Sequence, residues 1–179
     1  MPEEIQILLE RDDLKRVISR MAHEVVEKTA NCQELVLIGI RSRGVHLARR
    51  IAKKIQEGES FLPPVGIIDV TPYRDDRTQG LPEAKVGAFE VQVAVDEKTV
   101  VLIDDVIFRG RTIRAAMEAI ARLGQAKRIL VASLVDRGAR ELPIRADIVG
   151  INTEVGEGDR VNVRLEESDG IDRITVTRW

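Results

Sequence analysis

The residues best suited to chemistry lie in the segment Val100–Ala116, which reads VVLIDDVIFRGRTIRAA. Asp104 and Asp105 follow an apolar run, and a short loop with Gly110 leads to Thr112 at the start of a helical pattern. Amide groups at a helix start, with a hydroxyl beside them, form an anion site, and glycine lets the backbone approach the anion closely. Adjacent carboxylates accept hydrogen bonds from vicinal sugar hydroxyls and suit the neighbourhood of Mg²⁺. Phosphate and diol together predict a site for a ribose 5-phosphate.

The aspartate pair alone fits more than one kind of site. Adjacent aspartates at a strand end also occur in phosphoacceptor domains of the flavodoxin-like type, and a strand–turn–helix with a capping threonine is a common structural unit. The full string DDVxxxGRT, from Asp104 to Thr112, favours the ribose-phosphate site. It is not a Walker loop, because it lacks the pattern GxxxxGK[ST].

Three further polar segments follow predicted strands. The turn Gly39–Gly44, GIRSRG, carries Arg41 and Arg43, and each guanidinium is able to bind two oxygens of a polyanion at once. A long charged loop contains Tyr73–Asp76, YRDD, and the segment Val135–Gly138, VDRG, follows another strand. Taken alone, these segments are an ordinary strand–helix turn, an exposed loop and a plain turn.

The elements that must position these residues alternate between strands and helices. Apolar runs too short for a helix predict buried strands, and apolar residues at helical spacing predict helices, the first capped by Asp12 or Asp13. This alternation predicts a doubly wound, mainly parallel α/β sheet, in which ligands bind beyond the carboxyl ends of strands. The predicted strands are 5–9, 35–40, 65–70, 89–95, 99–104, 128–135, 147–151 and an antiparallel pair at 159–165 and 171–177; the predicted helices are 12–29, 44–57 and 111–123, and 71–87 is a long exposed loop.

The composition excludes several classes of protein. A chain of 179 residues predicts one domain, over residues 1–179. Five aromatic residues are too few for base-stacking platforms, and a net charge of −2 excludes a globally basic nucleic-acid binder while leaving room for a local basic patch. A single cysteine, Cys32, excludes an intrachain disulfide and indicates a reducing cytoplasm. Apolar runs of about five residues are too short to span a membrane.

Several segments carry a resemblance to a known family. The string DDVxxxGRT resembles the phosphoribosyl-pyrophosphate (PRPP) signature of type I phosphoribosyltransferases. Similarity extends over most of the chain, from about Leu14 to Ile151, to the PyrR family of bifunctional pyrimidine operon attenuators with uracil phosphoribosyltransferase activity. It implies the type I phosphoribosyltransferase fold, a doubly wound mainly parallel sheet with a small hood and a long flexible loop. The matching segments are RMAHEVVE at 20–27, LVLIGIRSRG at 35–44, GIIDVTPYRDD at 66–76 and LVDRGARELPIRAD at 134–147.

The resemblance implies a reaction of uracil with PRPP that gives UMP and pyrophosphate, with Mg²⁺ as cofactor. Asp104, Asp105 and Arg74 are implied as catalytic residues, and the two aspartates stand near the metal through PRPP or water. The implied uracil side is Val135, Asp136 and Arg137. The implied PRPP- and UMP-binding residues are Arg41, Ser42, Arg43, Gly44, Asp104, Asp105, Val106, Ile107, Phe108, Arg109, Gly110, Arg111 and Thr112.

A second surface is implied for messenger RNA of pyrimidine operons, with UMP as the corepressor. On the first predicted helix, one polar stripe is formed by residues spaced i, i+3, i+4 and i+7, namely Arg16, Ser19, Arg20 and His23. On its own, such a stripe is typical of a solvated helix face. The family also implies a homodimer or a higher homo-oligomer; the cytoplasmic location and the lack of membrane contact are expected from the single cysteine and the short apolar runs. The residues matching the family's RNA-binding pattern are Arg16, Ser19, Arg20, His23, Arg140 and Arg145.

The chain departs from the family pattern at several positions. Arg109 stands where the family usually has threonine, Ala139 replaces a common histidine and Ile151 replaces a lysine associated with RNA binding. Glu154 adds an anion, and Pro72 interrupts the entry to the long loop. Two alternatives therefore stand beside the main hypothesis. One is a nucleotide-sensing RNA regulator with weak or no catalysis, and the other is a phosphoribosyltransferase for another base.

Overall fold

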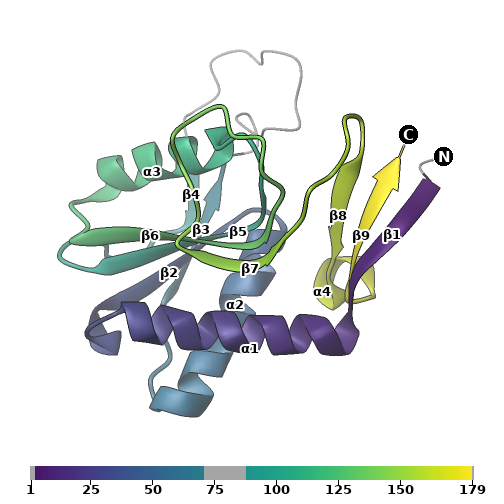
Figure 1. Ribbon diagram of the computed structural model, residues 1–179. Helices are drawn as coiled ribbons and strands as arrows, with labels where there is room; N and C mark the ends of the chain where they lie inside the picture. The colour runs from purple at the N-terminus through teal and green to yellow at the C-terminus, as the bar shows by residue number, and fades with distance from the viewer. Residues whose placement is uncertain (1–2, 71–87, 179) are drawn as a thin grey trace.

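A computed structural model describes residues 3–70 and 88–178 of the chain as a six-stranded and a three-stranded sheet with helices around them (Figure 1). In chain order the elements are β1 (Glu3–Glu10), α1 (Arg11–Lys28), a 3₁₀ turn (Cys32–Glu34), β2 (Leu35–Ile40), α2 (Arg43–Glu59), β3 (Val65–Asp69), β4 (Ala88–Val91), β5 (Thr99–Ile107), α3 (Arg111–Leu123), β6 (Arg128–Asp136), β7 (Ile148–Asn152), β8 (Arg160–Arg164), α4 (Glu166–Asp169) and β9 (Arg173–Arg178).

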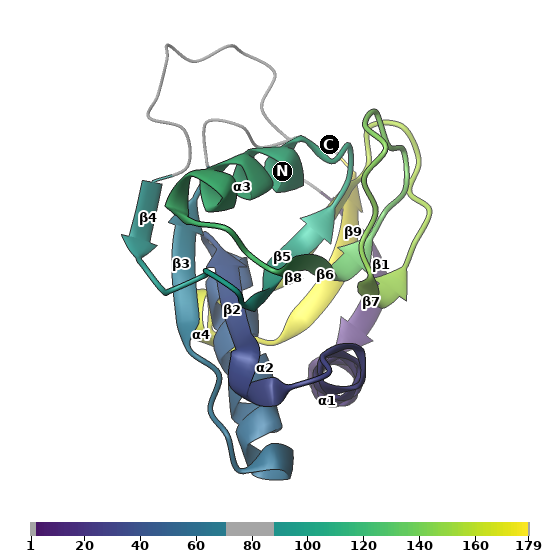
Figure 2. The same cartoon turned by 90° about the vertical axis from the view of Figure 1, so that its left-hand side faces the viewer.

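The larger sheet has the strand order β4-β3-β2-β5-β6-β7. Five of its strands, β3, β2, β5, β6 and β7, run parallel, and β4 pairs antiparallel with β3 at one edge. Helices α1 and α2 cover one face of this sheet, and α3 covers the other (Figures 1 and 2). The predicted doubly wound, mainly parallel sheet is confirmed.

The central strand β2 shows why this sheet forms. Leu35 and Leu37 pack into the cluster that contains α1 and α2, whereas Val36, Ile38 and Ile40 pack into the cluster that contains α3. A strand covered on both faces has to be apolar at every position rather than at alternate ones. All six residues of β2 are buried, which accounts for the uninterrupted run LVLIGI.

The smaller sheet, with the strand order β1-β9-β8, and α4 together form what is called the hood below. Its strands are antiparallel, and Glu3 pairs with Arg178, so the two ends of the described chain lie side by side (Figure 1). Val163 of β8 and Ile174 of β9 join the core cluster that contains α1. The predicted antiparallel pair at 159–165 and 171–177 and the predicted edge strand at 5–9 are confirmed.

Some predicted boundaries are wrong. Strand β4 ends at Val91 instead of residue 95, and β5 continues past Asp104 to Ile107 because its pairing with β6 extends that far. Helix α1 begins after Glu10 without a side-chain cap. Asp13 instead accepts a hydrogen bond from Arg16 at 2.6 Å, and its charge favours the helix start. The predicted loop at 71–87 lies outside the described residues.

Gly44 allows the first turn of α2 to approach β5 closely, so Gly44→Ala is expected to destabilise the fold. A Cβ atom at residue 44 would collide with the carbonyl oxygen of Ile103, and relief requires a backbone shift that costs about 1–3 kcal/mol. Gly58→Ala, in the same helix, is the matched control, since a Cβ there meets nothing within 4 Å. Urea unfolding should show a loss for the first variant and a small gain for the second. Equal stability of both variants would contradict this packing argument.

Candidate functional site

One cavity, of about 570 Å³, lies between the carboxyl ends of β2, β5 and β6 and the hood. This is where ligands bind in parallel α/β sheets. The wall from the main sheet and the segments that follow its strands contains Ile40, Arg41, Arg43, Asp104, Asp105, Val106, Phe108, Arg109, Thr112 and Arg137. The opposite wall contains Glu157, Gly158 and Asp159 of the turn before β8 and the hood residues Arg160, Val161, Asn162, Val163, Arg164 and Asp169.

The carboxylates of Asp104 and Asp105 are held by the backbone that follows them. The Asp105 amide donates to Oδ1 of Asp104 at 2.9 Å, and the Val106 amide donates to Oδ1 of Asp105 at 3.0 Å. Asp104 is buried and Asp105 is half-buried. These bonds fix two adjacent carboxylates near the carboxyl end of β5, where both line the cavity.

The β5–α3 loop, Phe108–Gly110, leads into the helix from the cavity side. Gly110 has φ of 96° and precedes the first turn of α3, and the buried Thr112 in that turn lines the cavity. The first amides of a helix have no acceptor within the helix and form a site for anions. Ile107, by contrast, is buried in the apolar core, so any contact from it to a ligand would come from its backbone.

Residues 138–144, called the bracing segment below, hold the β5–α3 loop in shape. Arg140 donates to the carbonyl oxygens of Phe108 at 2.7 Å and Ile144 at 2.7 Å, and to the carboxylate of Asp136 at 2.6 Å. The amides of Glu141 and Leu142 both donate to the carbonyl oxygen of Arg109. Arg140 therefore serves as a brace within the chain, which the sequence pattern did not indicate, and its contact with RNA stays a prediction.

Arg109 of this loop and Arg111 at the start of α3 share one acidic partner. The carboxylate of Glu141 lies 3.1 Å from Nε of Arg109 and also contacts Arg111. The guanidinium of Arg137 lies over the ring of Phe108, with 3.9 Å between its carbon and the ring centroid. Burial, followed by the charge of Arg109, lowers the pKa of Arg137.

The residues predicted for the uracil side do not all reach the cavity. Arg137 lines it, but Val135 is buried within the sheet. Asp136 accepts from Arg140 and from the Gly138 amide at 2.9 Å. The opposite wall comes from hood residues that sequence reasoning missed. Their only signal was the alternating pattern after a glycine-rich turn, which is also typical of an ordinary hairpin.

The β2–α2 turn places two further cations at the cavity. Arg41, which precedes a cis peptide bond to the exposed Ser42, contacts Glu90 of β4 at 2.5 Å. Arg43 pairs with Asp169 of the hood through two bonds, from Nε to Oδ2 at 3.2 Å and from Nη2 to Oδ1 at 2.7 Å. Gly44 is buried against β5. Arg74, predicted to be catalytic, lies outside the described residues.

Ion pairs attach the hood to α2. Arg50 contacts Glu167 at 2.6 Å and the buried Asp172 at 2.7 Å, which adds to the Arg43–Asp169 pair. Burial alone raises the pKa of Asp169, but hydrogen bonds from Arg43, the Leu165 amide and Ser168 outweigh it and lower that pKa to about 2. Because the folded-state pKa is lowered, this pair stabilises the fold at neutral pH, and the stabilisation is lost as the pH falls from about 4 towards 2.

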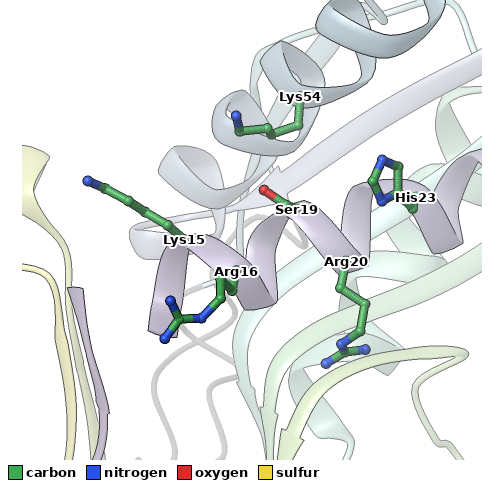
Figure 3. A pocket seen from close by; sticks show the side chains of 6 residues that line it. All are labelled: Lys15, Arg16, Ser19, Arg20, His23 and Lys54. Carbon is green, nitrogen blue, oxygen red and sulfur yellow. The ribbon is translucent and has the colours of Figure 1, made fainter. Parts of the chain in front are cut away.

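A second, basic hollow of about 560 Å³ lies over α1 and α2. Figure 3 shows Lys54 of α2 facing Ser19 across the hollow, while Arg20 extends away from it. Arg20 donates to the carbonyl oxygens of Val149 at 3.2 Å and of Gly150, so it also holds the edge strand β7. Arg145 is exposed on the segment before β7. The hollow is lined by Lys15, Arg16, Ser19, Arg20, His23 and Lys54, of which Lys15 and Lys54 were not predicted.

Comparisons with known proteins agree with this geometry. Residues 5–167 match the model of the phosphoribosyl transferase domain family. A bifunctional protein PyrR from Chloroflexus aurantiacus is 49% identical over 171 residues, which are 96% of this chain and 94% of that protein. Another from Pelotomaculum thermopropionicum is 48% identical over 98% of this chain and 97% of that protein.

The chain belongs to the PyrR family.

Solved structures of more distant proteins share the fold. A hypoxanthine phosphoribosyltransferase from Trypanosoma cruzi has a TM-score of 0.75 at 16% identity, over 98% of this chain and 92% of the other. One from Staphylococcus aureus has a TM-score of 0.72 at 17% identity, over 98% and 92%. At such identities the likeness concerns the type I phosphoribosyltransferase fold alone, and it does not favour a purine substrate.

The positions at which this PyrR family member departs from the pattern have defined places. Ala139 has φ of 53° and is exposed within the bracing segment. Ile151, where the family has a lysine, is half-buried and packs against the core cluster that contains α1. Glu154 is exposed after β7, and Arg109 is held by Glu141. Pro72 lies outside the described residues.

Neither a membrane span nor a metal cluster is found in the part of the chain that the structure describes. None of its helices is long and apolar enough to cross a membrane. Within residues 3–70 and 88–178, no three His, Cys, Asp or Glu side chains gather as a metal site. The carboxylates of Asp104 and Asp105 line one cavity, and such oxygen donors suit Mg²⁺ that is bound mainly through water and substrate phosphates.

Proposed function

We propose that this PyrR family chain is a uracil phosphoribosyltransferase, which converts uracil and PRPP to UMP and pyrophosphate, and a UMP-dependent regulator that binds pyrimidine operon mRNA. One observation carries the enzymatic half: a single cavity unites the carboxylates at the end of β5, the first turn of α3 and the guanidinium of Arg43. The nearly full-length similarity to bifunctional PyrR proteins supports both halves and does not favour the alternatives of a purely sensing protein or another base.

The cavity offers a separate partner for each part of PRPP. The amides at the start of α3, with Thr112, would hold the 5′-phosphate. Asp104 and Asp105 would accept hydrogen bonds from the ribose hydroxyls. Arg41 and Arg43 would hold the pyrophosphate, joined by Arg74 of the undescribed segment.

The reaction breaks the bond between C1 of the ribose and the pyrophosphate oxygen and forms a bond from C1 to N1 of uracil, and the proton of N1 passes to water or to the departing pyrophosphate. The negative charges of Asp104 and Asp105 would stabilise the oxocarbenium-like transition state. Positioning of the two reactants supplies the rest of the rate enhancement, and no covalent nucleophile is required. When bound, Mg²⁺ neutralises charge on the pyrophosphate, and substrate phosphates and water would hold it beside the two aspartates.

The direct test is formation of UMP from uracil and PRPP with Mg²⁺ present. We expect product above the blank with uracil and none with hypoxanthine, guanine or orotate in its place. If a purine base is turned over and uracil is not, the substrate is that purine rather than uracil. Binding of UMP without turnover of any base would reduce the protein to a nucleotide sensor.

The basic hollow supports the regulatory half. Its cations come from two helices that pack together, so they present charge over a broader surface than one helix stripe does. Such a surface attracts RNA phosphates, and binding through phosphates weakens steeply with salt. Arg16 pairs with Asp13 and Lys54 with Glu57 in the described structure, and RNA would compete with these exposed contacts.

Lys54→Gln is expected to weaken binding of a pyrimidine leader stem-loop about 3–10-fold at low salt and to lower the salt slope of binding by about 1. Lys53→Gln is the matched control, because Lys53 is exposed on α2 but does not line the hollow. Filter binding across a salt series measures both the affinity for RNA and its salt slope. If the two variants bind RNA equally well, RNA does not use the hollow.

We further propose that the protein acts in the cytoplasm as a homodimer or a higher homo-oligomer. The single cysteine is typical of proteins in a reducing compartment. Sedimentation equilibrium measures the assembly, and a monomer at all accessible concentrations would contradict the oligomeric part of this proposal.

A further inference from the structure

One ion pair between the main sheet's side of the cavity and the hood has both of its members in the cavity wall. Arg43 is the first residue of α2, Asp169 is the last residue of α4, and both line the cavity. Their side chains are 30% and 20% exposed, so water competes only in part for their charges. The hood thus supplies the partner of a cation that the proposed function, on which this inference rests, assigns to pyrophosphate.

The pair uses only one edge of the Arg43 guanidinium. A guanidinium is planar and carries five N–H donors in fixed directions. Nε and Nη2 each donate one hydrogen bond to Asp169, at 3.2 Å and 2.7 Å, and Nη1 donates to no residue that the structure describes. The three remaining N–H groups lie along the adjacent edge, which suits two oxygens of a phosphate. Asp169 therefore fixes the plane of the cation and leaves one edge of it for a ligand.

The Asp169 carboxylate is itself held within the hood. Its Oδ2 accepts hydrogen bonds from the Leu165 amide at 2.9 Å and from the Ser168 hydroxyl at 2.8 Å. These two donors share its negative charge, which limits its repulsion of an anion bound nearby. A long side chain such as that of Arg43 loses rotamer freedom when it binds a ligand, and here part of that loss has already occurred.

We propose that Asp169 is a positioning residue that holds the guanidinium of Arg43 with its free edge towards the pyrophosphate of PRPP. A second ion pair between α2 and the hood has the same construction without access to a ligand. Asp172 accepts from Arg50 at 2.7 Å and 3.0 Å and from the Glu166 amide at 2.8 Å, and neither Asp172 nor Arg50 lines the cavity. The Arg50–Asp172 pair attaches the hood, whereas the Arg43–Asp169 pair also shapes the site.

Asp169→Asn tests this role in the full-length protein with Mg²⁺ present. Asparagine keeps the size of the side chain and an oxygen for the Leu165 amide, but it removes the charge that holds Arg43. We expect Kd for pyrophosphate and KM for PRPP to rise about 3–10-fold, the scale of ordering one long side chain. Because pyrophosphate would be held equally in the ground state and the transition state, kcat should stay at the wild-type value. Kd for UMP, which lacks pyrophosphate, should also be unchanged.

Asp172→Asn is the matched control, since it makes the same change in the pair that lies outside the cavity. It should lower stability in urea unfolding and leave Kd for pyrophosphate, measured by calorimetry, at the wild-type value. An equal rise of that Kd in both variants would assign the effect to attachment of the hood and overturn the proposal. A lower Kd in Asp169→Asn would show that Asp169 competes with pyrophosphate for Arg43, which would overturn it as well.

Asp169→Glu provides a second variant if Asp169→Asn does not fold. It keeps the charge and lengthens the side chain by one methylene, so the guanidinium is displaced and Kd for pyrophosphate should again rise; a wild-type Kd would contradict positioning. In Arg43→Lys, which has no planar fork, Asp169→Asn should cause no further loss, and additive losses would contradict an action through Arg43.

The calorimetric readout separates this inference from the proposed reaction. Pyrophosphate binding needs neither uracil nor turnover, so a wild type that binds pyrophosphate but forms no UMP would reject the reaction alone. A wild type that binds no pyrophosphate would overturn the role of Asp169.

Discussion

Asp104→Asn is expected to lower kcat for UMP formation roughly 10²–10³-fold, the scale on which a fixed electrostatic partner of a transition state acts. Asparagine keeps the size of the side chain and an oxygen for the Asp105 amide, which Oδ1 of Asp104 accepts at 2.9 Å. The substitution therefore removes a negative charge beside the developing ribose cation and little else. Because the charge of the sugar changes mainly in the transition state, kcat should fall more than KM for PRPP rises.

Asp105→Asn provides the comparison at the neighbouring position. Asp105 is more exposed, and its Oδ1 is used by the Val106 amide in the same manner, so the loss should be similar in kind and smaller in size. Steady-state kinetics with uracil and PRPP, together with thermal unfolding of both variants, separates catalysis from folding. If the kcat of Asp104→Asn equals the wild-type value, the negative charge of Asp104 has no role in catalysis.

Arg140→Ala is expected to destabilise the protein by about 2–4 kcal/mol and to weaken UMP binding at least tenfold. The guanidinium joins the carbonyl oxygens of Phe108 and Ile144 to the carboxylate of Asp136, and it is four-fifths buried. Its removal leaves the largely buried carboxylate of Asp136 without its cation and takes away one of the contacts that hold the β5–α3 loop, on which phosphate binding would depend.

Arg145→Ala is the matched control for this effect, because Arg145 is exposed a few residues further along the chain. Urea unfolding and calorimetry with UMP give the two readouts. Loss of RNA binding in Arg140→Ala would then report the loss of the UMP site as well as any direct contact. If UMP affinity stays at the wild-type value, the bracing segment is dispensable for the phosphate site.

The parts of the fold that sequence could predict are those governed by local patterns. Strand β2 and helix α3 match their predicted bounds, since an apolar run between turns and an apolar helix face are both properties of neighbouring residues. Strand β5 is longer than predicted, because its pairing with β6 continues past the polar Asp104 and Asp105 to Ile107. Such pairing depends on a distant strand and leaves no local mark.

The same distinction applies to the site. Asp104 and Thr112 were found because they belong to one strand–loop–helix unit. The role of Arg140 was not, since Phe108 lies 32 positions away in sequence. Lys54 joins the hollow only through the packing of α2 on α1, and spacing within one helix carries no information about the other.

The pairing of β1 with β9 has a consequence for how the protein matures on the ribosome. The first strand of the chain finds its neighbour only after the last one has been synthesised, and β8, part of the cavity wall, depends on that late sheet. The nascent chain would thus acquire the nucleotide-binding parts of the large sheet before the cavity wall that β8 contributes.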